Sequence, residues 1–303
     1  MKERAPYMLY IITAPFIFVK MIIRVLTKLL GTHSITRLQI SAINLYYHRL
    51  PTSGFAFTIR YNGLRLRFKL KEKLAWSGFL RWHSEETEMK LLKVLCPFEV
   101  FIDVGAFVGI YSFSLVGDSR LVIAVEPNPS ALEVIKRNVL LNRLGDKLIV
   151  VPLVCHERDN MTVNFNYWKV SDNAYKAGLS GIFNKNAPYT TKVRTITLDT
   201  LVEKLKLACA DIIKIDVEGA ELFVLRGAMK LLTTHRPIIL IEIMDNNMPD
   251  CLDMFGKVGY TVFGPLTQYK GNANYLAVPK EKVSSLENVL KRFDIYSKHS
   301  SST

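Results

Sequence analysis

The stretch FIDVGAFVGIY, residues 101–111, constrains the fold of this 303-residue chain more than any other feature. The apolar run Val100–Val104 predicts a buried strand, and Asp103 brings a carboxylate to the end of that strand. Gly105 and Gly109 follow at once, and glycine adopts the turn conformations that other residues resist. Because a new apolar run begins after Gly109, we expect a strand, a tight turn and then a helix.

A second strand that ends in an acid completes this pattern. The apolar run Leu121–Val125 is followed by Glu126, about 20 residues beyond the glycine turn. A strand, a glycine turn, a helix and a second strand ending in an acid form a ribose-binding arrangement, in which the acid accepts hydrogen bonds from both ribose hydroxyls. A plain connection between a strand and a helix gives similar letters, so the short motif leaves both interpretations open.

The spacing of the glycines indicates which nucleoside ligand fits the turn. The pattern is G-x-x-x-G, and Phe107 stands where a pyrophosphate would need a second glycine for close approach. Together with the carboxylate of Asp103 at the turn, the missing glycine favours an adenosyl ligand that carries an amino acid instead of phosphates. The sequence therefore predicts S-adenosylmethionine as the cofactor.

The rest of the chain alternates between apolar runs and helical patterns, which is typical of a parallel sheet. The expected elements are helix Pro129–Arg143, strand Lys147–Val154, strand Asp211–Val217, helix Ala220–Leu232, strand Pro237–Ile243 and helix Met248–Lys257. Tyr260–Phe263 and Tyr275–Val278 predict an antiparallel pair at one sheet edge. Met161–Ile196 is irregular, with short β-like pieces, and indicates an insertion, where substrate-contacting loops are commonly found. We predict an α/β fold with a Rossmann-like doubly wound sheet, mostly parallel.

Composition divides the chain into four parts. We expect an apolar and basic helical extension over residues 1–50, a β-hairpin and linker over 51–83, the α/β domain over 84–280, and a C-terminal helix or tail over 281–303. The net charge of +13 is concentrated in residues 1–95, which hold 16 Lys and Arg against 5 Asp and Glu. A basic partner surface would therefore belong to the N-terminal third.

The N-terminal extension combines an apolar run with a basic stripe. Residues 5–19 carry no charge, and Lys20, Arg24 and Lys28 then recur every fourth residue, so they share one face of a helix. The uncharged run is short for a bilayer span, which needs about 20 apolar residues. We expect residues 7–30 to form a helix in a membrane interface, with its cations facing anionic head groups. A helix docked on the protein's own core or on a second copy, and a true span, are the alternatives.

A second basic feature follows in Phe55–Lys71, which predicts a β-hairpin turning at Asn62-Gly63. In its second strand the apolar and basic residues alternate, and the basic face consists of Arg65, Arg67, Lys69 and Lys71. This row suits an anionic head group, a glycan or a nucleic acid. A row of cations is also the ordinary solvated face of an edge strand that resists aggregation.

The cysteines indicate the redox environment in which the protein is found. Cys96, Cys155, Cys209 and Cys251 are far apart, form no C-x-x-C pair and have no histidine at zinc-binding spacing, which fits a reducing environment. No small-residue cleavage site follows the N-terminal apolar run, which argues against a secretory signal. We expect a cytoplasmic protein that is peripheral on the cytoplasmic face of a membrane if its N-terminal helix binds there.

Four segments in order resemble a known family. They are FIDVGAFVGIYS, VIAVEPNPSALEVIKRNV, TITLDTLVEKL and IIKIDVEGAELFVLRGA, and together they are similar to the FkbM-type methyltransferases, a branch of the class I S-adenosylmethionine-dependent enzymes. The similarity covers roughly residues 84–280. It implies a seven-stranded sheet whose last strand is antiparallel, and O-methylation of a sugar, polyketide, glycan, lipid-linked or other small hydroxylated molecule.

The resemblance also implies a set of site residues. The methionine part of the cofactor and its turn would be held by Asp103, Gly105, Ala106, Gly109 and Tyr111. Glu126 would bind the ribose with Pro127 and Asn128 beside it, and Cys155 and His156 would lie near the adenine. Asp216 and Glu218 of the D-V-E-G segment would face the transferred methyl group. Phe107 departs from the family, which often has Asn there.

Other functions remain open at the level of sequence. The segment D-V-E-G, in place of N-P-P-Y, argues against methylation of exocyclic amino groups, and a nucleic-acid partner is not expected. The alternatives to an O-methyltransferase are a protein-lysine or RNA methyltransferase, and a non-catalytic membrane-associated adenosyl-binding module. Asp245 and Asn246 with Asp216 would offer three oxygen donors to Mg²⁺, but Asp and Asn also favour turns, so we assign no metal ligand.

Overall fold

The computed structural model describes residues 56–69, 72, 86–171 and 180–297. The chain divides into two units, Met1–Ser53 and Gly54–Thr303, and every described residue belongs to the second. The helix that we expect over residues 7–30 therefore lies outside the described residues. Within the described ranges, no helix is long and apolar enough to cross a membrane.

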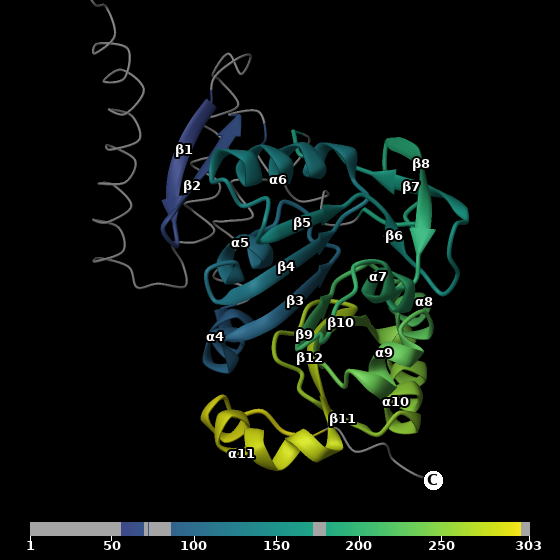
Figure 1. The fold of residues 1–303 in the computed structure, drawn as a ribbon. Coiled ribbons are helices and arrows are strands. Elements are labelled where there is room, and N and C mark those ends of the chain that lie inside the picture. The colour runs from purple at the N-terminus through teal and green to yellow at the C-terminus, as the bar shows by residue number, and fades with distance from the viewer. Residues whose placement is uncertain (1–55, 70–71, 73–85, 172–179, 298–303) are drawn as a thin grey trace, which may run out of the picture. The chain divides into compact units, whose positions relative to one another are not determined.

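The described residues form a central sheet of seven strands in the order β11-β12-β10-β9-β3-β4-β5 (Figure 1). The strands are β3 (Phe98–Val104), β4 (Ser119–Val125), β5 (Leu148–Val151), β9 (Ile212–Ile215), β10 (Ile238–Met244), β11 (Tyr260–Phe263) and β12 (Asn272–Pro279). Neighbours from β10 through β5 are parallel, whereas β12 runs antiparallel to both β10 and β11. The predicted mostly parallel sheet, its antiparallel last strand and the edge pair are confirmed.

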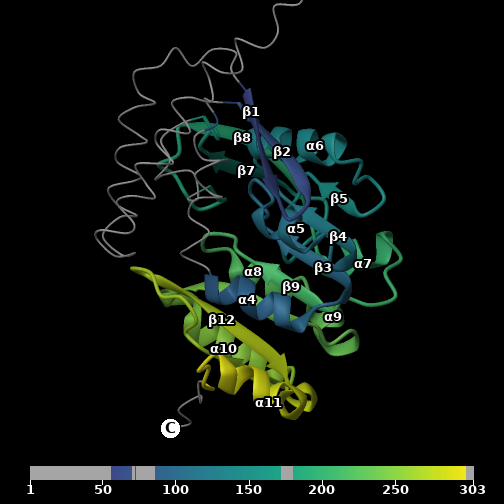
Figure 2. The same ribbon diagram turned by 90° about the vertical axis from the view of Figure 1, so that its left-hand side faces the viewer.

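The central strands are buried on both faces because helices cover both. All four residues of β9 are buried, and the adjoining parts of β3 and β10 are nearly as enclosed. The covering helices are α4 (Glu86–Leu95), α5 (Ile110–Leu115), α6 (Pro129–Leu141), α7 (Leu198–Lys204), α8 (Glu221–Arg226), α9 (Met229–Thr234) and α10 (Met248–Lys257). Helices α7 to α10 gather along one side of the sheet, and α4 and α5 lie on the other (Figures 1 and 2). After β12 come η4 (Lys280–Lys282) and α11 (Val283–Arg292).

The order of the strands reverses between β3 and β9. The chain runs outward from β3 through β4 to β5, and then returns to place β9 and β10 on the other side of β3. In open α/β sheets, ligands bind at the carboxyl ends of the strands at such a switch point. The fold therefore places the ends of β3 and β9, with Asp103 and Asp216, at the expected binding position.

The predicted helix Ala220–Leu232 is wrong as one element, because α8 ends at Arg226 and α9 begins at Met229. A carboxylate from α7 provides the physical reason. Asp199 accepts hydrogen bonds from the backbone N–H groups of Lys230 and Leu231, at 3.0 and 2.7 Å, and so caps the start of α9. Its own N–H donates to the carbonyl of Gly227, which fixes the break between the two helices.

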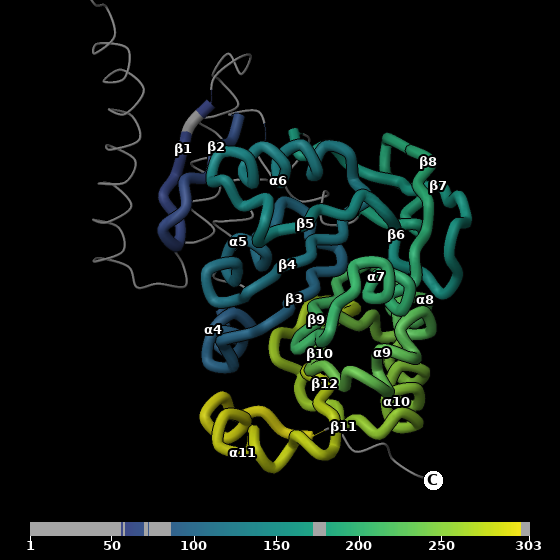
Figure 3. The backbone as a smooth tube through the Cα atoms, in the orientation of Figure 1, coloured from purple at the N-terminus to yellow at the C-terminus, as the bar shows by residue number. Residues whose placement is uncertain are grey.

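The predicted insertion contains more regular structure than its sequence indicates. Strands β6 (Val154–Cys155), β7 (Thr162–Tyr167) and β8 (Tyr189–Ile196) form a separate three-stranded sheet in the order β6-β8-β7 (Figure 3). The predicted strand Lys147–Val154 accordingly splits, since β5 ends at Val151 and β6 joins this second sheet.

The predicted β-hairpin is confirmed. Strands β1 (Ala56–Tyr61) and β2 (Leu64–Lys69) are antiparallel and turn at Asn62 and Gly63, both of which have positive φ. The turn is fastened to α5, because the Tyr61 hydroxyl lies 2.6 Å from Ser114 Oγ and Asn62 Nδ2 donates to the Ser114 carbonyl. The hairpin is thus tied to the same βαβ unit that carries the glycine turn.

Candidate active site

Asp103 is the carboxylate at the end of β3, and it organises the turn that follows. One oxygen, Oδ2, accepts hydrogen bonds from Ser112 Oγ at 2.6 Å and from Ser112 N at 3.1 Å, which ties the strand end to α5. The other oxygen, Oδ1, is buried and has no hydrogen-bond partner. Burial raises the pKa of this carboxyl, and the nearby Lys214 cation opposes that rise.

Gly105 is required by a close contact between the two central strand ends. It has φ +79°, and a Cβ built on it would lie 1.8 Å from the carbonyl oxygen of Asp216. The turn after β3 therefore touches the end of β9 directly. At Gly109, φ is +82° and a Cβ would meet the Phe113 ring at 2.9 Å. Side chains at either position would push the turn away from its neighbours.

Glu126 lies at the end of β4 and holds the glycine turn from the other side. Its Oε2 accepts from Phe107 N at 2.6 Å and its Oε1 from Asn128 N at 2.7 Å. The carboxylate is 5% exposed, and burial raises its pKa to about 7. Phe107 has φ +49°, which an asparagine tolerates more readily than a phenylalanine. The Glu126 contact thus stabilises an unfavourable backbone conformation.

Lys214 is a buried cation between these strand ends. It lies on β9 in register with Asp103 on β3, and its Nζ donates to Asp216 Oδ2 at 2.8 Å. The Lys214 side chain is 6% exposed and that of Asp216 is 28% exposed. Nζ also lies 4.7 Å from the centre of the Tyr111 ring. The buried Lys214 ammonium balances the charge of Asp216, whose carboxylate remains partly exposed.

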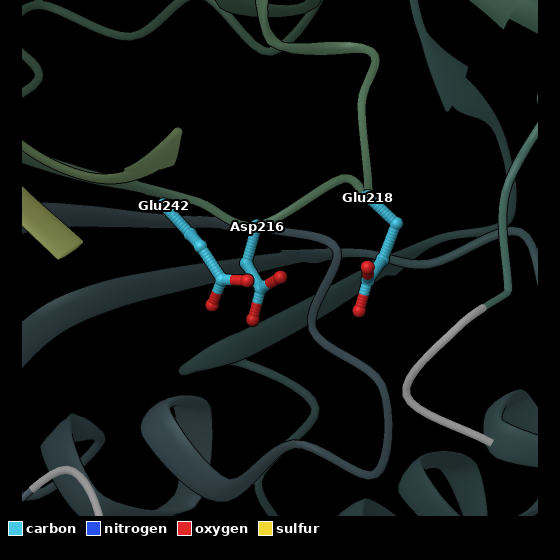
Figure 4. Close-up of side chains that lie close together, drawn as sticks. All are labelled: Asp216, Glu218 and Glu242. Carbon is cyan, nitrogen blue, oxygen red and sulfur yellow. The ribbon is translucent and has the colours of Figure 1, made fainter. Parts of the chain in front are cut away.

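Three carboxylates converge where β9 and β10 end. Asp216, Glu218 and Glu242 each bring an oxygen within 4.8 Å of the others, and all three side chains project in the same direction (Figure 4). Asn272 on β12 donates through Nδ2 to Glu242 Oε1, which orients that side chain. The group is half-buried, so its oxygens are accessible to a ligand.

A buried clamp fixes the loop that carries Glu218. Glu218 and Gly219 both have positive φ, at +51° and +98°. Glu221 Oε1 accepts from Gly219 N at 2.7 Å, and its Oε2 accepts from Asn247 Nδ2 at 2.6 Å. Asn247, in the 3-10 helix η3 (Asp245–Asn247), also donates to the Gly219 carbonyl at 3.1 Å. These bonds hold the loop in its strained conformation.

The family model described as methyltransferase FkbM domain matches residues 103–262, which is more than half of the chain. The matched region begins at Asp103 and contains the glycine turn, Glu126, the three carboxylates and the Glu221 clamp. The chain belongs to the FkbM methyltransferase family. Residues 103–262 therefore form an FkbM methyltransferase domain, as the four sequence segments predict.

Among solved structures, similar chains include the FkbM methyltransferase of Methylobacillus flagellatus KT, with 18% identity, a TM-score of 0.43, and 60% of this chain and 44% of that chain covered. Another is TYW2 of M. jannaschii in complex with AdoMet, with 16% identity, a TM-score of 0.44, and coverage of 75% and 86%. Trm5b of Pyrococcus abyssi matches with 16% identity, a TM-score of 0.41, and coverage of 73% and 54%. This chain spans less than half the length of the first of these. A search of curated proteins found no significant match.

The structure gathers most of the predicted cofactor residues of this FkbM domain around one turn. Ala106 N and Gly105 N both donate to the Val125 carbonyl, and Gly109 N donates to that of Ala106. Asn128 begins α6, where its Oδ1 accepts from Ser130 N, and Pro127 lies beside it. The cofactor roles of these residues remain predictions.

Cys155 ends β6 of the second sheet, and His156 follows it directly. The Cys155 thiol is buried in the core, where burial raises its pKa to about 12. His156 stacks on Phe223 of α8, with ring centres 4.6 Å apart, and burial lowers its pKa. Both side chains pack against neighbouring residues of the domain, and their predicted adenine contacts remain predictions.

The three clustered carboxylates are not the set of metal ligands that the sequence suggests. In the described part of the chain, Asp216 groups with Glu218 and Glu242, and Asp245 is not a member of this group. Three carboxylate oxygens suit a divalent cation, but the Lys214 ammonium already occupies one side of Asp216. We assign this group no metal.

Lys214, Glu221 and Glu242 are site residues that the sequence does not reveal as such. Glu242 and Lys214 lie inside apolar strands, and only the register of β10, β9 and β3 brings them to the strand ends. A charged residue within an otherwise buried strand is the one available signal, because such a charge requires a partner.

Proposed function

We propose that this FkbM enzyme methylates a hydroxyl group of a sugar, a glycan, a lipid-linked molecule or another small molecule. The observation that carries the proposal is the convergence of Asp216, Glu218 and Glu242 beside the Gly105 turn. A hydroxyl is a weak nucleophile until it loses its proton, so its methylation benefits from a carboxylate that orients it and accepts that proton.

The residues around the turn fit the cofactor. Asp103 Oδ1 is a buried acceptor without a partner, and an ammonium group would satisfy it. Each Glu126 oxygen accepts one backbone N–H and has capacity for a further hydrogen bond, which suits ribose hydroxyls. Asp103, Gly105 and Glu126 would therefore hold S-adenosylmethionine. When bound, this cofactor supplies an electrophilic methyl group on a sulfonium.

The chain's own residues would act on the acceptor. Asp216 ends β9 at the switch point, which is next to the turn that would hold the cofactor. Its outward oxygen would accept the proton of the acceptor hydroxyl, while Lys214 holds the carboxylate in place. Glu218 is a second candidate for the base, because it lies on the same side in the clamped loop. Precise alignment of the acceptor would account for much of the rate enhancement.

The β7–β8 region would supply a wall on the acceptor side. A Cβ at Gly181 would lie 3.5 Å from the Glu218 carbonyl, and the Phe183 ring lies 5.7 Å from that of Phe223. Phe183 is 52% exposed, although it is a large apolar side chain. An exposed aromatic ring next to Gly219 would offer a flat surface to the apolar face of a sugar ring or to a lipid-linked group.

The test is methyl transfer from labelled S-adenosylmethionine to glycan, lipid, protein and RNA fractions of the host cell. We expect label in a glycan, lipid or small-molecule fraction, at an ether linkage that resists mild base. With that acceptor, Asp216→Asn should lower turnover by roughly 10²-fold or more, and cofactor affinity should change little. Asp146→Asn, at an exposed acid outside the site, is the matched control.

Three outcomes would contradict this proposal. Label in protein or RNA would show that the acceptor is a protein or an RNA and not a small hydroxylated molecule. Bound cofactor without transfer to any fraction would favour a non-catalytic module. If Asp216→Asn and Glu218→Gln both keep full turnover per folded molecule, neither carboxylate is the base.

A further inference from the structure

The β1–β2 hairpin is docked on α6 by a ladder of two asparagines. Asn138 and Asn142 lie one helical turn apart, and each amide pairs with the backbone of one residue of β2. Asn142 accepts from Arg65 N and donates to the Arg65 carbonyl, both at 2.8 Å. Asn138 does the same with Arg67, at 2.6 and 3.3 Å. Four residues of helix rise about 6 Å and two residues of strand about 6.6 Å, so the two repeats match.

The ladder determines which side chains of β2 face outward. Leu66 and Phe68 are fully buried beneath the strand, so Arg65, Arg67 and Lys69 project to the exposed side. The row of three cations extends about 13 Å along the strand. With Arg60 on β1 it forms what we call the basic face. Because the ladder holds the backbone, this face is rigid.

Nothing among the described residues balances these charges. Residues 56–69 contain four cations and no acidic residue. The side chains of Arg60, Arg65, Arg67 and Lys69 form no ion pair with another described residue, whereas Arg137 on the adjacent helix is paired with Glu72 at 2.6 Å. An exposed edge strand needs a few charges to resist aggregation. Charges of both signs would resist aggregation equally well, so this need does not explain a row of cations alone.

Two of the cations oppose each other. Arg60 and Arg65 are direct cross-strand partners, and like charges in that position destabilise a hairpin. A pocket of about 390 Å³ lies between them and is also lined by Asn62, Gly63 and Asn142. An anionic group in this pocket would remove the repulsion, and guanidinium groups match the geometry of a phosphate.

We propose that the basic face binds the surface of an anionic membrane, with a lipid phosphate between Arg60 and Arg65. Charge complementarity supports this partner, because polybasic segments are attracted to anionic head groups. The sequence upstream supports it too, since residues 5–28 combine an apolar run with a basic stripe, and durable membrane binding generally requires two signals. Nucleic acid is the less suitable partner, because single strands need aromatic stacking platforms, and Phe68 is buried while the Tyr61 hydroxyl contacts Ser114.

The test is sedimentation of the full chain with vesicles of phosphatidylcholine alone or with about one-third phosphatidylglycerol. The variant Arg60→Gln, Arg65→Gln, Arg67→Gln, Lys69→Gln removes the charges and keeps much of the side-chain length. Each cation near a membrane surface contributes about a fivefold factor. We therefore expect the variant to bind anionic vesicles at least about a hundredfold more weakly, and the unchanged chain to show little binding to phosphatidylcholine alone.

A matched control removes four exposed lysines elsewhere: Lys192→Gln, Lys204→Gln, Lys206→Gln and Lys230→Gln. It should keep nearly all binding, and Arg60→Lys with Arg65→Lys should keep most of it. Thermal unfolding of each variant shows whether the fold is retained. The proposal is overturned if the hairpin variant binds as the unchanged chain does, if the control loses as much, or if the loss occurs with an RNA oligonucleotide and not with vesicles.

Discussion

At the scale of single residues, Glu126 combines an expected role in ribose binding with a structural role. It lies where a ribose-binding acid is expected, and it also accepts the backbone N–H groups that hold the Phe107 turn. Its burial makes the ionised form costly, while its hydrogen bonds favour that form. The balance raises the pKa of Glu126 to about 7, so the stability of the protein should depend on its protonation.

The direction of that dependence follows from proton binding. Because the pKa of Glu126 is raised from an ordinary 4.5 to about 7, the folded chain binds this proton more tightly than the unfolded chain. The contribution to stability is complete below about pH 4.5 and is lost as pH rises through about 7. In Glu126→Gln this contribution is absent, and we expect the stability difference between the two proteins to change by roughly 3 kcal/mol between pH 4.5 and 8.

Urea unfolding of both proteins at several pH values measures this difference, and other titrating groups cancel in the comparison. A constant difference across the range would mean that Glu126 does not titrate in this window.

The position of Glu126 could be predicted from sequence because an acid directly after an apolar run marks a strand end. Glu242 could not be predicted in the same way. It lies inside the run of β10, and only the pairing with β12 brings it beside Asn272. Asn247 is similar, because its role depends on the path of η3 past the Gly219 loop.

At the scale of elements, most strands and helices could be predicted because each has a clear apolar period. The break between α8 and α9 could not, since the carboxylate that caps α9 comes from α7, about 30 residues earlier. The strands of the insertion could be predicted only as short β-like pieces for a related reason. Strand β7 has few buried residues, so its sequence lacks the apolar alternation of a core strand.

The Glu221 clamp gives a prediction at this scale. In Glu221→Ala, the half-buried donors Gly219 N and Asn247 Nδ2 both lose a hydrogen bond to a buried carboxylate. Each unsatisfied group costs roughly 1–3 kcal/mol, so the free energy of unfolding should fall by about 2–6 kcal/mol. Urea denaturation measures this fall. Glu287→Ala, on the exposed surface of α11, should have almost no effect, and an equally small effect at Glu221 would show that the clamp is unimportant.

At the scale of the whole molecule, the switch point between β3 and β9 explains why residues distant in sequence meet. Asp103, Glu126 and Asp216 lie at the ends of β3, β4 and β9 in one sheet. Gly105 allows the turn after β3 to contact the end of β9. The parallel order could be predicted from the alternation of elements. The contact between Gly105 and Asp216 could not, because neither residue carries a sequence signal for the other.

The central claim is that this edge of the sheet binds the cofactor. Hydrogen exchange of the full chain, with and without the reaction product S-adenosylhomocysteine, tests it most directly. The account predicts added protection of backbone amides in residues 103–112, 126–130 and 216–221, and no change in the β1–β2 hairpin. Saturable binding that protects other segments and leaves these three unchanged would contradict it.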